Sequence, residues 1–69
     1  MSGKHAIYVV VKSKDGQIES KDHGLLNLIN LYHCDTTLVA FHRDWNTHCL
    51  HHFGYVLEIV DVGYEWSYE

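Results

Sequence analysis

The sequence predicts an α+β fold: one mainly antiparallel sheet of about four strands with two helices, in the order strand, strand, helix, strand, helix, strand. Three patterns predict it: a β-branched and aromatic run at residues 7–11 before a glycine turn, helix-spaced apolar residues within 25–32, and alternation at 64–69. The 69 residues contain no repeat and no linker, so we expect a single small domain, residues 1–69, around one thin core.

The first two predicted strands form a hairpin. Residues 5–12 contain an uninterrupted β-branched and aromatic run, which is typical of a strand covered on both faces, and we expect this strand to be central in its sheet. The turn at residues 13–16 ends on Gly16, which supplies the positive φ that such a turn needs. A short second strand is expected at residues 17–20.

The first helix is expected to begin after Asp22, because a short carboxylate side chain suits the N-cap position. Its apolar residues recur at i, i+3, i+4 and i+7, and they are Leu25, Leu28, Ile29 and Tyr32. Asn27 and Asn30 are expected to face outward. Leu26 and Leu31 widen the apolar face beyond one core contact, which indicates that part of this helix packs on a second copy in a homodimer.

The second half of the chain is expected to contain a strand, a helix and another strand. Residues 36–42 are rich in Thr, Val, Leu and Phe, which favours a third strand. Asp44 is expected to cap a second helix that ends at Phe53, with Gly54 as the residue that follows its C-terminus. The fourth strand is expected at residues 55–62.

The last residues of the sequence alternate between aromatic and polar side chains. Tyr64, Trp66 and Tyr68 alternate with Glu65, Ser67 and Glu69, which is the period of a strand with one aromatic face. This segment either continues the fourth strand past a bulge at Gly63 or doubles back as a fifth strand. Its aromatic residues suit the centre of a protein interface, and they equally suit packing against a helix.

Charge is unevenly distributed along the chain. The formal net charge is −4, and it arises from +1 over residues 1–34 and −5 over residues 35–69. Five Lys and Arg residues are too few for a basic face that contacts phosphates, so we expect no direct nucleic-acid binding. The acidic second half instead favours a partner protein with a basic surface.

Cellular location is predicted from the apolar runs and the cysteines. The longest apolar run near the start, residues 6–11, is too short for a signal-peptide core or a membrane span. We therefore expect a cytoplasmic protein that does not bind membranes. In that reducing environment the two cysteines, Cys34 and Cys49, remain thiols or bind metal.

A cluster of histidines and cysteines indicates a possible zinc site. His48 and His52 are four residues apart on the second predicted helix, a spacing that lets two imidazoles reach one ion. Cys49 and Cys34 are the candidate thiolate ligands, with His33 or His42 as further candidates. The competing interpretation is packing, in which the helix buries Trp45, Cys49 and Phe53 while its histidines lie at the boundary.

The sequence contains no catalytic motif, and a chain of this size has little interior for a substrate cleft beside a core, so no enzymatic activity is expected. Our leading hypothesis is a small acidic protein-binding module, an inhibitor that occupies a basic, nucleic-acid-handling groove on its partner. The predicted partner-binding residues are Glu58, Asp61, Tyr64, Glu65, Trp66, Tyr68 and Glu69. The alternative is a zinc-stabilised or metal-sensing domain, and a third is a homodimer whose histidine-rich helix responds to pH.

Overall fold

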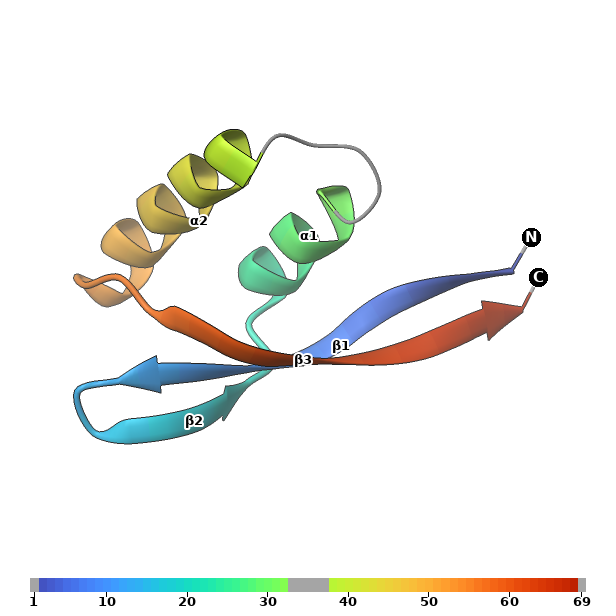
Figure 1. The fold of residues 1–69 in the computed structure, drawn as a ribbon, viewed down its shortest axis with the longest axis horizontal. Helices are drawn as coiled ribbons and strands as arrows, with labels where there is room; N and C mark the ends of the chain where they lie inside the picture. Colours follow the sequence, from blue (N-terminus) through green and yellow to red (C-terminus); the bar gives the residue numbers. More distant parts are fainter. Residues whose placement is uncertain (1, 33–37, 69) are drawn as a thin grey trace.

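The computed structural model describes residues 2–32 and 38–68, which form one antiparallel sheet with two helices on one of its faces (Figure 1). The elements are β1 (Ser2–Ser13), β2 (Gly16–Ser20), α1 (His23–Leu31), α2 (Leu38–Phe53) and β3 (Glu58–Tyr68). The strand order is β2-β1-β3, so the prediction that the first strand is central is confirmed. The α+β class is also confirmed, whereas the described residues contain three strands rather than about four.

The predicted hairpin is present between β1 and β2. The two strands pair antiparallel as far as Ser13 opposite Gly16, and Gly16 has a φ of 109°. The Ser13 hydroxyl accepts a hydrogen bond from the N–H of Asp15 at 3.2 Å and donates one to the carbonyl of Gly16 at 3.3 Å. The turn chemistry therefore acts as the sequence predicts, with glycine in the left-handed region.

Helix α1 begins as predicted, with Asp22 as its N-cap. The Asp22 carboxylate accepts a hydrogen bond from the N–H of Leu25 at 2.9 Å, which satisfies one of the donors left open at a helix start. The outward orientation predicted for Asn30 is wrong, because its Oδ1 accepts a hydrogen bond from the N–H of Ala6 at 2.8 Å. Strand β2 pairs with β1 only from Val9 onward, so on this edge of β1 the N–H of Ala6 has no acceptor on a neighbouring strand. The Asn30 side chain supplies the acceptor.

The predicted third strand at residues 36–42 is wrong. Residues 38–42 belong to α2, which begins at Leu38 rather than after Asp44, while residues 36 and 37 lie outside the described residues. The stripe that faces the core has a spacing of four residues through the whole helix, and it consists of Phe41, Trp45, Cys49 and Phe53. The rings of Phe41 and Trp45 lie 5.8 Å apart, so core packing outweighs the local strand preference of residues 39–41.

The C-terminus of α2 agrees with the prediction from the sequence, whereas β3 begins later than predicted. Gly54 ends the helix as predicted, with a φ of 81° and an N–H that donates to the carbonyl of Leu50 at 3.2 Å. Residues 54–57 are not part of a strand, so the strand predicted at residues 55–62 begins only at Glu58. It then continues to Tyr68 as one strand, which excludes the predicted alternative of a fifth strand that doubles back.

Pairing between β1 and β3 contains two irregularities. Ala6 pairs with Tyr64 and Tyr8 pairs with Gly63, so the bulge predicted at Gly63 has its extra residue, Ile7, on β1 instead. A second shift leaves Val60 of β3 as an extra residue. Each bulge increases the local twist, and the sheet is strongly twisted in Figure 1.

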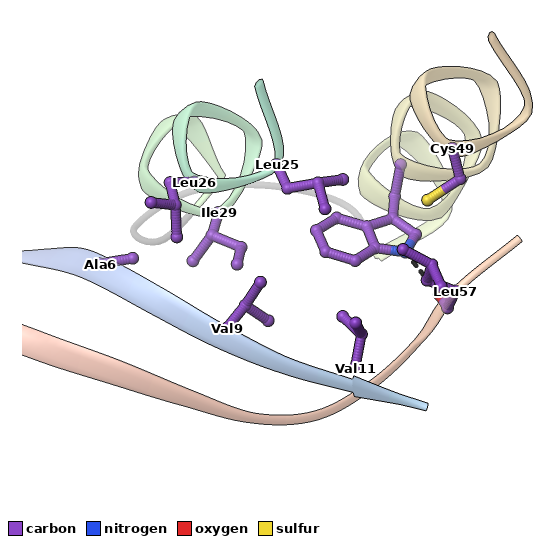
Figure 2. Packing of buried hydrophobic residues seen from close by; sticks show 9 residues of the cluster. Ala6, Val9, Val11, Leu25, Leu26, Ile29, Cys49 and Leu57 are labelled. Atoms are coloured by element: carbon purple, nitrogen blue, oxygen red, sulfur yellow. Dashed lines mark hydrogen bonds between the residues drawn. The ribbon is translucent and has the colours of Figure 1, made fainter. Parts of the chain in front are cut away.

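The core lies between the sheet and the two helices (Figure 2). Its buried members are Ala6, Val9, Val11, Leu25, Leu26, Ile29, Trp45, Cys49 and Leu57. Trp45 and Cys49 are buried, as the packing interpretation of α2 predicts, whereas Phe53 is half-buried. Leu26, which the sequence indicates as part of a dimer face, is instead buried in the core, whereas Leu31 is exposed. No helix within the described residues is long and apolar enough to cross a membrane.

Candidate functional site

The predicted partner-binding residues lie together on β3, one of the two edge strands of the sheet. Glu69 is the exception, because it lies outside the described residues. The other six occupy one continuous strand, and they are Glu58, Asp61, Tyr64, Glu65, Trp66 and Tyr68. The sequence leaves open whether residues 64–69 continue the strand of Glu58 and Asp61 or double back, and the structure places all six on one strand.

The three acidic residues of β3 lie on the face of the sheet that the helices do not cover. Val9 and Val11 of β1 are buried beneath the helices, so side chains at the alternate positions of that strand point to the opposite face. Asp61 is paired with Val10 and Glu58 with Lys12, and paired residues share a face. Glu65 lies on the same face, because its partner His5 is next to the buried Ala6 and therefore points to the opposite face of the sheet.

The two described aromatic side chains of β3 lie on the helix-covered side. Tyr64 is opposite Ala6, and it is half-buried at the margin of the core with the Lys4 ammonium 4.2 Å from the centre of its ring. Trp66 is opposite Lys4 but 60% exposed, because the ends of β1 and β3 extend past α1 as a two-stranded arm (Figure 1). The aromatic row thus divides into Tyr64, which packs, and Trp66, which is available to a partner.

Strand β3 contains three carboxylates, Glu58, Asp61 and Glu65, which form the acidic row, and no basic side chain. The sequence contains no Lys, Arg or His after His52. The ion pairs formed among the described residues join Lys21 to Glu19, Arg43 to Asp44 and His48 to Asp22, and none of them involves the acids of β3. Glu58, Asp61 and Glu65 are exposed, so this strand presents a negative surface.

Apolar residues next to the acidic row were missed by the sequence analysis. Ile7 and Val60, the two extra residues at the bulges, are 37% and 44% exposed. Tyr8 lies against the backbone of Gly63, so closely that a Cβ at Gly63 would be 2.0 Å from the tyrosine ring. The run at residues 7–11 predicts a strand covered on both faces, whereas the described helices cover only one, and periodicity alone cannot show this.

The histidine and cysteine cluster is only partly assembled in the described residues. The rings of His48 and His52 have centroids 4.2 Å apart, and Nε2 of His48 is 3.0 Å from Oδ1 of Asp22. Cys49 is fully buried, and burial raises the pKa of its thiol, which disfavours the thiolate that zinc requires. Cys34 lies outside the described residues, in which no group of three or more His, Cys, Asp or Glu side chains could hold a metal ion.

His48 instead acts at the start of α1. Its ring lies over Gly24, where a Cβ would be 2.1 Å from Cε1 of the imidazole. The N–H of Leu25, together with His48, holds the pKa of the Asp22 carboxyl below its ordinary value of 3.8. His48 therefore joins α2 to the N-cap of α1.

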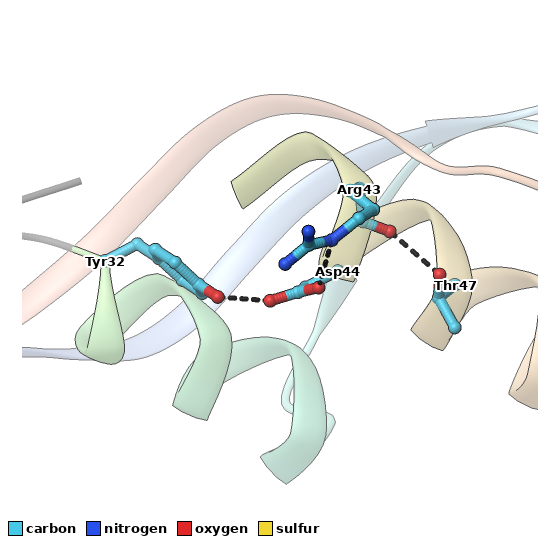
Figure 3. Close-up of polar contacts among 4 residues, drawn as sticks. All are labelled: Tyr32, Arg43, Asp44 and Thr47. Carbon is cyan, nitrogen blue, oxygen red and sulfur yellow. Dashed lines mark hydrogen bonds and ion pairs between the residues drawn. The ribbon is translucent and has the colours of Figure 1, made fainter. Parts of the chain in front are cut away.

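A groove of about 430 Å³ separates the exposed sides of α1 and α2. At one end Asp44, predicted as an N-cap, lies within α2 and accepts hydrogen bonds from the Tyr32 hydroxyl and, at 3.1 Å, from Nε of Arg43 (Figure 3). Both hydrogen bonds hold the pKa of the Asp44 carboxyl below its ordinary value, and the bond from Tyr32 has the larger effect. The Thr47 hydroxyl donates to the carbonyl of Arg43 at 2.9 Å within α2, so these polar groups already have hydrogen-bond partners in the structure.

The fold and this surface define a class: a small α+β domain with a three-stranded antiparallel sheet, two helices on one face and an acidic edge strand. No protein-family model matches the chain, and no curated protein or solved structure matches it at a significant level.

Proposed function

We propose that this chain is a non-enzymatic protein-binding module that docks β3 on a basic surface of a partner protein. The observation that supports it most directly is the row of exposed carboxylates on Glu58, Asp61 and Glu65, which form no ion pair within the described part of the chain, beside the exposed Trp66. Such a surface attracts a basic partner over a distance, and an exposed indole supplies the apolar anchor of the contact.

The length of the acidic row suits a groove that handles nucleic acid. From Glu58 to Glu65 the strand advances roughly 20 Å at about 3.3 Å per residue, with one residue taken up by the bulge at Val60. Carboxylates spread over this length resemble in sign and extent a short stretch of phosphate backbone. Occupying the groove would exclude its nucleic-acid ligand, and the module would act as an inhibitor.

The arrangement of potential nucleophiles supports a binding role over catalysis. Cys49 is buried and is held as the thiol, and the groove between α1 and α2 is lined by Thr47 and histidines but by no cysteine among its described residues. The Thr47 hydroxyl donates within its own helix. None of these groups forms the pair of nucleophile and base that covalent catalysis requires.

A comparison of two charge-matched variants tests the proposal. The purified protein and two double variants, Asp61→Asn/Glu65→Gln on β3 and Asp15→Asn/Glu19→Gln on the hairpin, serve as baits in cell extracts. Captured proteins are eluted with duplex DNA and quantified by mass spectrometry. We expect a DNA-eluted protein that the β3 variant loses and the hairpin variant keeps, whereas equal capture by all three baits would contradict the proposal.

Zinc binding, a pH-responsive homodimer and a cytoplasmic location stay predictions from the sequence. The pair of His48 and His52 is the feature that favours a metal site, with Cys34 as a candidate ligand outside the described residues. Leu31 on α1 remains an exposed apolar residue available to a second copy.

A further inference from the structure

We propose that the partner contributes a basic, extended segment that pairs with the outer edge of β3 and extends the sheet by one strand. This inference rests on the proposed function and specifies how the contact is made. Strand β3 runs from Glu58 to Tyr68 and pairs with β1 along one side, and no strand of the described residues pairs along its other side. An edge of this length is a ready site for strand addition.

The hydrogen-bond register shows which backbone groups of β3 face that edge. The N–H of Ala6 points to Asn30 and not to β3, so Ala6 and Tyr64 form a non-hydrogen-bonded pair of the ladder. Such pairs alternate with hydrogen-bonded ones, so Lys4 and Trp66 form the next non-hydrogen-bonded pair. The N–H and C=O of Trp66 therefore point outward to an added strand.

The composition of β3 identifies the chemistry of that strand. Strand β3 is 11 residues long and contains neither Lys nor Pro, which protect many natural edges. Its own protection consists of the bulge at Val60 and of acidic side chains, and the N–H of Val62 already donates to the Asp61 carboxylate at 2.9 Å, so an added strand would pair chiefly around Trp66. What it contains is Glu58, Asp61 and Glu65, and two antiparallel copies centred on Gly63 would place Asp61 opposite Glu65 twice. Like charges opposite each other destabilise a sheet. Other registers of two copies avoid this opposition but gain no attraction between charges, because β3 contains no Lys, Arg or His, whereas a basic strand is attracted to the carboxylates, so a basic strand is favoured over a second copy.

The two faces of β3 also predict the pattern of the added segment. Asp61 and Glu65 share the uncovered face of the sheet, and cations on alternate residues of the added strand would lie about 5 Å from them. Trp66 and Ile59 lie on the other face and would contact the intervening residues, which are therefore apolar. The occupant is a segment in which basic and apolar residues alternate.

Three labelled peptides test strand addition on the full chain. The first is a seven-residue peptide of alternating Lys and Val, and the others bear N-methyl groups on either the Lys or the Val amides. All three have the same charge, but each methylated peptide lacks the N–H donors of one edge. By fluorescence anisotropy we expect the first to bind and at least one methylated peptide to bind about tenfold more weakly, because backbone hydrogen bonds are lost.

Two variants of β3 provide the matched test on the protein. Trp66→Thr removes the indole and keeps the outward N–H, whereas Trp66→Pro removes both and leaves the ladder to β1 intact. We expect the proline variant to bind the first peptide about tenfold more weakly than the threonine variant. If circular dichroism shows that the proline variant does not fold, the methylated peptides decide the question.

The outcomes separate this inference from the proposed function. Equal binding of all three peptides, each weakened by Asp61→Asn/Glu65→Gln, would overturn strand addition while supporting an acidic docking surface. Binding that is insensitive to Asp61→Asn/Glu65→Gln, or no binding of any peptide, would overturn both the assigned surface and the added strand. A dimer in sedimentation velocity that Trp66→Pro abolishes would assign the edge to a second copy and overturn the basic occupant.

Discussion

The indole Nε1 of Trp45 donates a hydrogen bond of 2.7 Å to the carbonyl oxygen of Leu57, and both residues are buried (Figure 2). Trp45 lies in the middle of α2, and Leu57 is the residue before β3 begins. This contact fixes the position at which the chain leaves the helix layer and enters the sheet. The start of the acidic strand is therefore tied to a buried side chain of α2, while pairing with β1 positions the rest of the strand.

Replacing this tryptophan tests the contact. Trp45→Phe keeps an aromatic ring and removes the donor, which leaves the buried carbonyl of Leu57 unsatisfied at a cost of about 1–3 kcal/mol in the free energy of unfolding. Trp45→Ala adds a cavity and is expected to cost about 3–5 kcal/mol. Urea unfolding monitored by circular dichroism measures both. Trp66→Phe is the control, and a loss as large as that of Trp45→Phe would show that the hydrogen bond contributes nothing specific.

Gly63 is required by the ring of Tyr8 and not by an unusual backbone angle. Gly63→Ala would force the ring away from a Cβ only 2.0 Å from it, and we expect a loss of about 1–3 kcal/mol in the free energy of unfolding. Gly3→Ala, which meets nothing within 4 Å, is the control. In the background Tyr8→Ala the loss from Gly63→Ala should disappear, and a loss that persists there would contradict this explanation.

The Asp22 cap predicts a dependence of stability on acid. Its pKa is lower in the folded than in the unfolded chain, so the folded state binds this proton more weakly. The contribution of Asp22 is present above its ordinary value of 3.8 and is lost as the pH falls through the lowered folded pKa. Asp22→Ala is expected to cost about 1 kcal/mol at pH 7. Thermal melts from pH 7 to pH 2 should show the difference from the wild type shrinking in acid, and a constant difference would be inconsistent with this role.

Burial of Cys49 predicts that its sulfur does not bind metal. In a Cys34→Ser background, titration with cobalt(II) should give no sulfur-to-metal charge-transfer absorption, because the remaining thiol is enclosed in the core and its pKa is raised by burial. A charge-transfer band that is then removed by Cys49→Ser would show that the core opens to let cobalt reach this thiol. Titration of the Cys49→Ser variant with cobalt(II) tests in the same way whether Cys34 binds metal, because Cys34 is then the only cysteine left.

Parts of the fold that depend on neighbours in the sequence could be predicted without the structure. The turn ending at Gly16, the Asp22 cap, the helix end at Gly54 and the alternation through Tyr68 each arise from the backbone and side chains of a few adjacent residues. Alternation does not explain why Glu58 and Asp61, three residues apart, share one face, because this depends on the bulge at Val60. These features correctly place the first hairpin and the start of the first helix, whereas the sequence predicts that the candidate binding strand begins three residues too early and leaves its course after Gly63 open.

The structure of residues 38–43 could not be read from local preference. Val39 and Phe41 favour a strand by type, but Phe41 is spaced for the core stripe of Trp45 and Cys49, and packing of that stripe decides in favour of a helix. Asn30 is a similar case, since its hydrogen bond joins residues 24 positions apart.

The sequence by itself determined an acidic, alternating strand preceded by a capped helix and a glycine turn, because these patterns are set by short-range sterics and hydrogen bonding. Only the tertiary structure decided which face of that strand is covered, that Tyr64 packs while Trp66 is exposed, and that Cys49 is enclosed. Those outcomes depend on which surfaces meet when distant segments bury their apolar area together, and no local pattern specifies that choice.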